Sequence, residues 1–225
     1  KGWEDIHPMG FNQSEEDEGT FIFTLVTSGI FLLCPYMDEI DYVKFPDLMS
    51  EKERKSLSAY YKSSIQRFMY AQGSDKVFLS KNVMSTGRLN TIIEMFPKAK
   101  IVYIVRSPYA AVPSFISMFS AAWKAHSPEI PENSKYHRAW GELAMDYYIY
   151  FHENIKKLPE SQWCVLKYED LVAHPYQEMV KIYNHFGMSV SPVFEDRLKN
   201  ASGRSKKYKS SHSYSLEQYG MTKEE

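Results

Sequence analysis

The feature that most constrains the fold is an apolar run that ends at Arg106. The five residues before Arg106 are Ile-Val-Tyr-Ile-Val, and a lysine precedes them. This pattern is typical of a strand that is buried on both faces of a parallel sheet. Ser107 and Pro108 follow, and these residue types favour the cap and the first position of a helix. We therefore predict a strand over 100–105 and a helix over 109–121.

Arg106 and Ser114 form a candidate anion site at this strand–helix junction. The guanidinium stands at the carboxyl end of the strand, beside a helix N-terminus whose dipole favours negative charge. Its forked donors suit a phosphate group. Ser114 follows eight residues later, about two helical turns, and extends the same polar face. The alternative is a buried junction whose arginine pairs with a carboxylate.

Strands and helices alternate along the rest of the chain. Further strands are predicted over 76–80 and 163–166, and helices over 16–34, 50–72, 87–96, 135–157 and 175–187, with a short helix after Pro192. This alternation indicates an α/β fold with a central parallel sheet flanked by helices. The length of 225 residues fits a single domain over 1–225, and no internal repeat is present.

Composition and charge exclude several classes of protein. A net charge of −1 argues against a nucleic-acid partner. The apolar run over 21–36 is interrupted by polar residues and is too short to cross a membrane, so no membrane segment is expected. Cys34 and Cys164 lie far apart, and we expect free thiols; no cysteine spacing suggests a metal site.

Four segments together resemble the PAPS-dependent sulfotransferases, in particular the group with a tyrosylprotein-sulfotransferase-like core. They are residues 76–82, 96–108, 165–171 and the basic stretch 203–210, and they occur in the family's order. The resemblance implies a P-loop-NTPase-like sheet of the sulfotransferase type. It also implies an in-line, metal-independent transfer from PAPS (3′-phosphoadenosine 5′-phosphosulfate) to a hydroxyl or amine acceptor, with PAP as the product.

The same resemblance assigns roles to individual residues. Arg106 and Ser114 match the pair that binds the 3′-phosphate, and Tyr168 matches a tyrosine beside the adenine. Lys81 matches a lysine that contacts the sulfuryl group and stabilises the transition state. A basic loop over the nucleotide would contribute Arg204, Lys206 and Lys209. The alternatives are an exposed loop lysine at position 81, helix capping by Asp170 in place of a nucleotide contact at Tyr168, and a solvated run of charges after position 203.

The chain departs from the family pattern in two places. Cytosolic members carry a catalytic histidine two residues after the lysine, where this chain has Val83. His7 and Glu16 are the candidate bases within the chain; the alternatives, which the residue types favour, are a loop histidine at position 7 and a helix-start carboxylate at position 16. The glycine-rich loop that would hold the 5′-phosphosulfate is also missing from the sequence. We therefore expect roughly 30–60 further N-terminal residues with a βα unit in the native protein, and the base is equally expected there.

Two other functions fit the same features. A P-loop-type kinase would have the same arrangement of a parallel sheet flanked by helices. A non-catalytic PAP-binding or scaffold relative would keep the fold without turnover. The acceptor is expected to be a small molecule or a peptide. The cytoplasm is the favoured compartment, with the secretory-pathway lumen as the alternative if the expected N-terminal segment carries an anchor.

Overall fold

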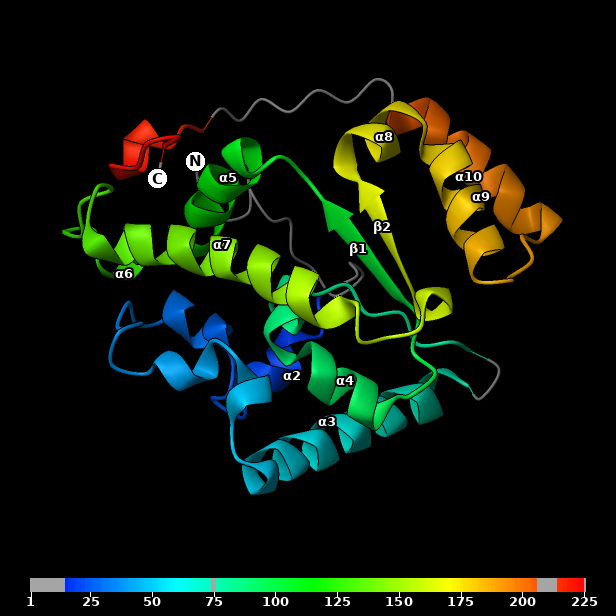
Figure 1. Cartoon of the computed structure of the whole chain (residues 1–225), viewed down its shortest axis with the longest axis horizontal. Helices are drawn as coiled ribbons and strands as arrows, with labels where there is room; N and C mark the ends of the chain where they lie inside the picture. The colour runs from blue at the N-terminus through cyan, green and yellow to red at the C-terminus, as the bar shows by residue number, and fades with distance from the viewer. Residues whose placement is uncertain (1–14, 74–75, 206–213, 225) are drawn as a thin grey trace.

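A computed structural model describes residues 15–73, 76–205 and 214–224, and Figure 1 shows how its elements are arranged. In chain order, with η for a 3-10 helix, they are α2 (Glu18–Ile22), η1 (Ser28–Leu32), η2 (Asp41–Val43), η3 (Pro46–Leu48), α3 (Glu51–Gln72), η4 (Val83–Arg88), α4 (Leu89–Met95), β1 (Ile101–Val105), α5 (Pro108–Ser120), α6 (Trp123–His126), α7 (Lys135–Ile155), η5 (Glu160–Gln162), β2 (Trp163–Lys167), α8 (Tyr168–Ala173), α9 (Pro175–His185), α10 (Pro192–Ser205) and η6 (Glu217–Tyr219). A small parallel sheet lies among helices, and the predicted α/β class is confirmed.

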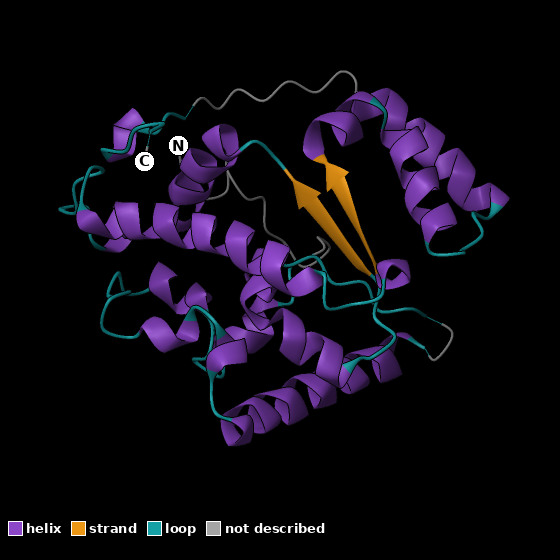
Figure 2. Ribbon diagram, in the orientation of Figure 1, coloured by secondary structure: helices purple, strands orange, loops and turns teal. Residues whose placement is uncertain are grey.

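Strands β1 and β2 make up the sheet in the described part of the chain (Figure 2). They are parallel and in register, from Ile101 opposite Trp163 to Val105 opposite Lys167. The connection between them runs through α5, α6 and α7, as parallel strands require a long crossover. Because both strands point the same way, the residues that follow them meet at one edge of the sheet.

Helix α7 covers one face of this sheet. Tyr103 of β1 stacks on Phe151 of α7, with ring centroids 3.6 Å apart. Val102 and Ile104 of β1 point to the opposite face and are 39% and 51% exposed, although Leu166 of β2, which pairs with Ile104, is 5% exposed. The expected burial of β1 on both faces is therefore wrong for the described residues, because its Val102 and Ile104 side chains are exposed.

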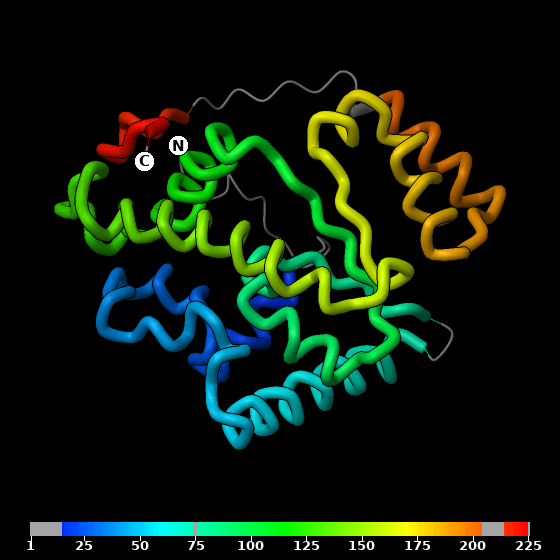
Figure 3. Tube along the Cα trace, viewed as in Figure 1, coloured from blue at the N-terminus to red at the C-terminus, as the bar shows by residue number. Residues whose placement is uncertain are grey.

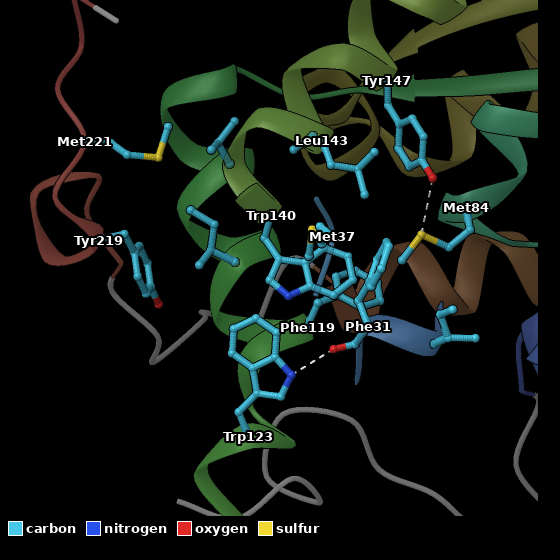
Figure 4. Close-up of a cluster of buried hydrophobic side chains, with 14 of the residues drawn as sticks. Phe31, Met37, Met84, Phe119, Trp123, Trp140, Leu143, Tyr147, Tyr219 and Met221 are labelled. Carbon is cyan, nitrogen blue, oxygen red and sulfur yellow. Dashed lines mark hydrogen bonds between the residues drawn. The ribbon is translucent and has the colours of Figure 1, made fainter. Parts of the chain in front are cut away.

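The main core lies between α5, α7 and the segment that contains η1 (Figure 4). Trp140 is fully buried at its centre, with ring centroids 5.0 Å from Phe119, 6.0 Å from Phe31 and 6.4 Å from Trp123. The indole nitrogen of Trp123 donates to the carbonyl oxygen of Phe31 at 2.8 Å. This bond satisfies a polar group that burial would otherwise destabilise, and it ties η1 to the long helices.

The segment 214–224 returns to pack beside α5 and α7 (Figure 3). Met221 fits against Gly141 of α7, where a Cβ atom would lie 2.7 Å from the methionine sulfur. Tyr219 stacks on His137, with ring centroids 5.8 Å apart. The end of the chain is thus part of the main core.

The predicted helix over 16–34 is wrong, because the chain forms two short pieces, α2 and η1, with a turn between them. Thr24 explains the break: its hydroxyl donates to the carbonyl of Phe21 and accepts from the N–H of Val26. Such local side-chain bonds compete with the helical ladder. Leu25 then takes a φ of 58°, which a continuing right-handed helix does not allow.

The predicted strand over 76–80 is also wrong for the described residues. This segment is drawn as a loop in Figure 2 and pairs with neither β1 nor β2. Val77 and Leu79 are 92% and 90% exposed. A strand needs a hydrogen-bonded partner, and the apolar composition of these residues does not provide one.

Most other helices and strands agree with those predicted from the sequence. The predicted strands over 100–105 and 163–166 correspond to β1 and β2, and the helices over 50–72 and 135–157 correspond to α3 and α7. The helix predicted over 87–96 is shorter, because its beginning belongs to the 3-10 helix η4; α9 ends two residues before its predicted end, at His185. Within the described ranges, no helix is both long enough and apolar enough to cross a bilayer.

Candidate functional site

Arg106 and Tyr168 meet at the edge of the sheet where β1 and β2 end. The guanidinium carbon of Arg106 lies over the Tyr168 ring, 4.9 Å from its centroid. The hydroxyl of Tyr148, on α7, donates to the carbonyl oxygen of Arg106 at 2.9 Å and so fixes the backbone at the strand end. Tyr168 itself begins α8, and the alternative role of Asp170 as a helix cap is not observed.

Arg106 stands directly before the start of α5, as the sequence predicts. Ser107 occupies the N-cap position and Pro108 the first turn, but no side chain caps the helix. Arg106 is half-buried and forms no ion pair with a carboxylate in the described part of the chain. The junction therefore combines an uncapped helix N-terminus with unpaired guanidinium donors, a combination that suits an anion.

Ser114 lies on α5, two turns after its first residue, and is half-buried. Pro113 precedes it and is buried against the core. The serine hydroxyl has no hydrogen-bond partner among the described side chains, so its donor is available to a ligand on the polar side of α5.

Lys81 and Glu16 form the second part of the site. The ammonium of Lys81 contacts the carboxylate of Glu16 in an ion pair. The Lys81 side chain is 78% exposed, whereas that of Glu16 is 17% exposed. The sequence indicated Lys81 and Glu16 as separate catalytic candidates, and the structure brings them into contact. Nothing in the sequence indicated that they would pair.

Asn82 and Arg88 connect this pair to the protein interior, and sequence reasoning missed both. The amide of Asn82 donates to Asp17 at 2.9 Å and to Glu18 at 2.7 Å. Arg88 is 1% exposed and donates to Glu18 at 2.6 Å. Asn82 directly follows Lys81, which is the one signal that could have suggested a role; an arginine near a helix start normally indicates an exposed residue.

The remaining candidate site residues come from the two ends of the chain. His7, Lys206 and Lys209 lie outside the described residues. Arg204 belongs to the last turn of α10, so the helix after Pro192 is longer than predicted. Within the described ranges, no hydrogen bond or ion pair joins the pair Lys81–Glu16 to the pair Arg106–Tyr168.

Comparison with known proteins identifies similar sequences. The model of the sulfotransferase family matches residues 36–192. The omega-hydroxy-beta-dihydromenaquinone-9 sulfotransferase Stf3 of Mycobacterium bovis is 28% identical over 141 residues, which cover 63% of this chain and 36% of the relative. The protein of the same name from Mycobacterium tuberculosis matches to the same extent. The chain therefore spans little more than a third of the length of these curated relatives.

Solved structures show a similar fold. The sulfotransferase STF1 of Mycobacterium tuberculosis superposes with a TM-score of 0.69 at 21% identity, over 96% of this chain and 54% of that chain. The sulfotransferase STF9 of Mycobacterium avium superposes with a TM-score of 0.73 at 16% identity, over 99% of this chain and 58% of that chain. The fold is thus of the sulfotransferase type, and both solved chains are considerably longer.

Proposed function

The chain belongs to the sulfotransferase family, and from this premise we propose that it transfers a sulfuryl group from PAPS to an acceptor hydroxyl or amine. The observation that supports this function most is the junction at Arg106. There a guanidinium that pairs with no described carboxylate, an aromatic ring and a helix N-terminus lie at the carboxyl edge of a parallel sheet. Open α/β folds bind their ligands at this edge.

The residues at the junction fit a nucleotide that carries a 3′-phosphate. Arg106 would bind the phosphate through its in-plane donors, and the hydroxyl of Ser114 would add a neutral hydrogen bond. Tyr168 offers a ring face close to the guanidinium, where an adenine can lie. Bound PAPS would supply the activated sulfuryl group.

Lys81 and Glu16 would act on the reacting atoms. The acceptor oxygen forms a bond to sulfur as the bond from sulfur to the phosphate oxygen breaks, and the acceptor proton goes to the carboxylate of Glu16. Lys81 would stabilise the negative charge that develops on the oxygens around the sulfur. Holding a base and a cation together supplies the positioning on which group transfer depends.

The acceptor is proposed to be a small molecule with an apolar body and a hydroxyl group. Phe23 and Leu25 are exposed in the turn directly after α2, the helix that follows Glu16. Leu33 and Tyr36 are exposed a few residues further on. Apolar side chains in contact with water next to the proposed base favour an apolar partner. The name of the Stf3 relatives describes action on a hydroxylated menaquinone, which is of this chemical kind.

The test is a titration of the full-length protein with PAP by calorimetry, followed by a turnover assay with PAPS and hydroxylated lipophilic acceptors. PAP binding together with sulfated product is the expected result. PAP binding without turnover across acceptors would favour the non-catalytic relative. Binding of Mg-ATP without binding of PAP would favour a P-loop-type kinase and contradict the proposal.

A further inference from the structure

We propose that Asn82 and Arg88 are positioning residues that hold the acidic turn, residues 16–18, against Lys81. This inference rests on the proposed function, because it concerns how Glu16 comes to act as its base. Neither side chain touches the reacting atoms in this arrangement. Each acts through a neighbouring carboxylate of the acidic turn.

Asn82 fixes the positions of Lys81 and of the acidic turn at once. Its backbone continues from Lys81, and its amide nitrogen donates to one carboxylate oxygen of Asp17 at 2.9 Å and one of Glu18 at 2.7 Å. Its amide oxygen accepts from the N–H of Met84 at 2.9 Å, where it caps η4. One side chain therefore ties the residue after Lys81 to the two residues after Glu16.

Arg88 anchors the same turn from inside the protein. Its guanidinium donates to Glu18 at 2.6 Å and lies over the ring of Phe21, 3.6 Å from the centroid. Thr27 also donates to Glu18, at the oxygen that Arg88 does not contact. A buried arginine needs such a carboxylate partner, because burying an unpaired charge is costly. The position of Glu18 is thus set by the core.

Asp17 is held in the same way. One of its oxygens accepts from Asn82, and the other accepts from the hydroxyl of Tyr61, which lies on α3. Burial and this bond raise the pKa of Tyr61 above its usual range, so the hydroxyl stays a donor at neutral pH. Two of the three carboxylates in the turn are therefore committed to structural bonds.

Glu16 is the carboxylate of the turn that remains for chemistry. Both oxygens of Glu18 and both of Asp17 accept hydrogen bonds from described residues, whereas Glu16 meets the exposed ammonium of Lys81. The oxygens of Asp17 and Glu18 are thus occupied by structural donors. The geometry therefore separates the turn into two anchors and one base.

The sharpest test replaces Asn82 by an isosteric carboxylate. Asn82→Asp keeps the oxygen that caps η4 but puts negative charge against Asp17 and Glu18, so the acidic turn is pushed away from Lys81. We expect kcat with PAPS to fall about tenfold or more, while KM for PAPS and PAP affinity change less than about twofold. Asn82→Ala is measured in parallel, because it removes the donor without adding charge and keeps the test decisive if Asn82→Asp does not fold.

Asn90→Asp is the matched control. Asn90 is equally half-buried, and its amide donates to Tyr150 at 3.1 Å and Asn154 at 3.0 Å, away from the acidic turn. Asn90→Asp makes the same chemical change as Asn82→Asp and removes the same number of hydrogen-bond donors. We expect kcat to fall less than about threefold.

A double-mutant cycle decides whether Asn82 acts through Glu16. If it does, Asn82→Ala combined with Glu16→Gln is no slower than Glu16→Gln alone. Additive losses of kcat, or a fall in PAP affinity equal to the fall in kcat, would overturn the inference while the proposed function stands. A wild-type protein that does not turn over PAPS would instead overturn the proposed function.

Discussion

The guanidinium of Arg106 lies over the ring of Tyr168 at 4.9 Å, and each of these residues directly follows a strand of the sheet. The contact arises from strand register, since Val105 pairs with Lys167 one position earlier. A cation over a ring face contributes about 0.5–1 kcal/mol at an exposed site. Among the described residues no carboxylate pairs with the guanidinium, so its N–H donors remain available to a ligand.

Replacing Arg106 by alanine is expected to weaken PAP binding by about 2–4 kcal/mol, because a charge-assisted partner of a phosphate is lost. Calorimetric titration of the full-length protein measures this directly. The PAP affinity of Arg106→Lys should lie between those of the wild type and Arg106→Ala, since a lysine keeps the charge but not the forked geometry. An unchanged affinity in Arg106→Ala would remove Arg106 from the nucleotide site.

Ser114→Ala should weaken PAP binding less, by about 1 kcal/mol, because the lost hydrogen bond involves a neutral hydroxyl. Ser64→Ala serves as the control, since this hydroxyl on α3 bonds only to the carbonyl of Tyr60 in its own helix. Calorimetry again provides the measurement. Equal effects from the two variants would show that Ser114 has no role in binding.

Lys81→Ala is expected to lower kcat roughly 100-fold or more, with little change in PAP affinity, because the lysine acts on charge that develops in the transition state. The measurement is steady-state turnover of PAPS together with PAP calorimetry. Lys55→Ala is the matched control, since Lys55 is another exposed lysine in an ion pair, with Glu51 on α3. Near-normal turnover in Lys81→Ala would identify Lys81 as an ordinary loop lysine.

Stability should fall as the pH drops below about 6.5, the ordinary pKa of histidine, because of His137. Burial lowers the pKa of His137 in the folded protein, so the unfolded chain takes up a proton at a higher pH than the folded chain does. The stability from the neutral form is therefore complete above the unfolded pKa and decreases from there down to the folded pKa. Thermal unfolding of the wild type and of His137→Gln at pH 7.5 and 5.5 tests this. The wild type should lose more stability than His137→Gln between pH 7.5 and pH 5.5. Equal losses would show that His137 is not the cause of the pH dependence.

The 225-residue chain is expected to self-associate through the exposed side chains of β1. Val102 and Ile104 present apolar side chains there, and exposed strands with apolar faces promote association. Light scattering and sedimentation of the wild type and Ile104→Thr provide the test. Association should decrease in the variant, and a wild-type chain that stays monomeric at high concentration would show that this face is tolerated in water.

Local patterns predicted the parts of the fold whose signals are complete within one segment. Helix α3 begins where Ser50 and Glu53 form a capping box, and the apolar run before Arg106 became β1. The junction of β1 and α5 was predicted for the same reason, since strand end, cap position and proline are adjacent in sequence. The helix over 16–34 failed because hydrophobicity alone does not show that Thr24 bonds to its own backbone.

What the sequence determined by itself was the alternation of strands and helices and the position of Arg106 where a strand ends and a helix begins. Tertiary structure decided that Tyr168 meets Arg106, that Lys81 meets Glu16, and that Arg88 is buried against Glu18. The physical reason is the range of the interactions. Caps, turns and apolar periodicity act between neighbours in the chain, whereas a strand partner or a buried ion pair depends on distant segments whose contact no local pattern encodes.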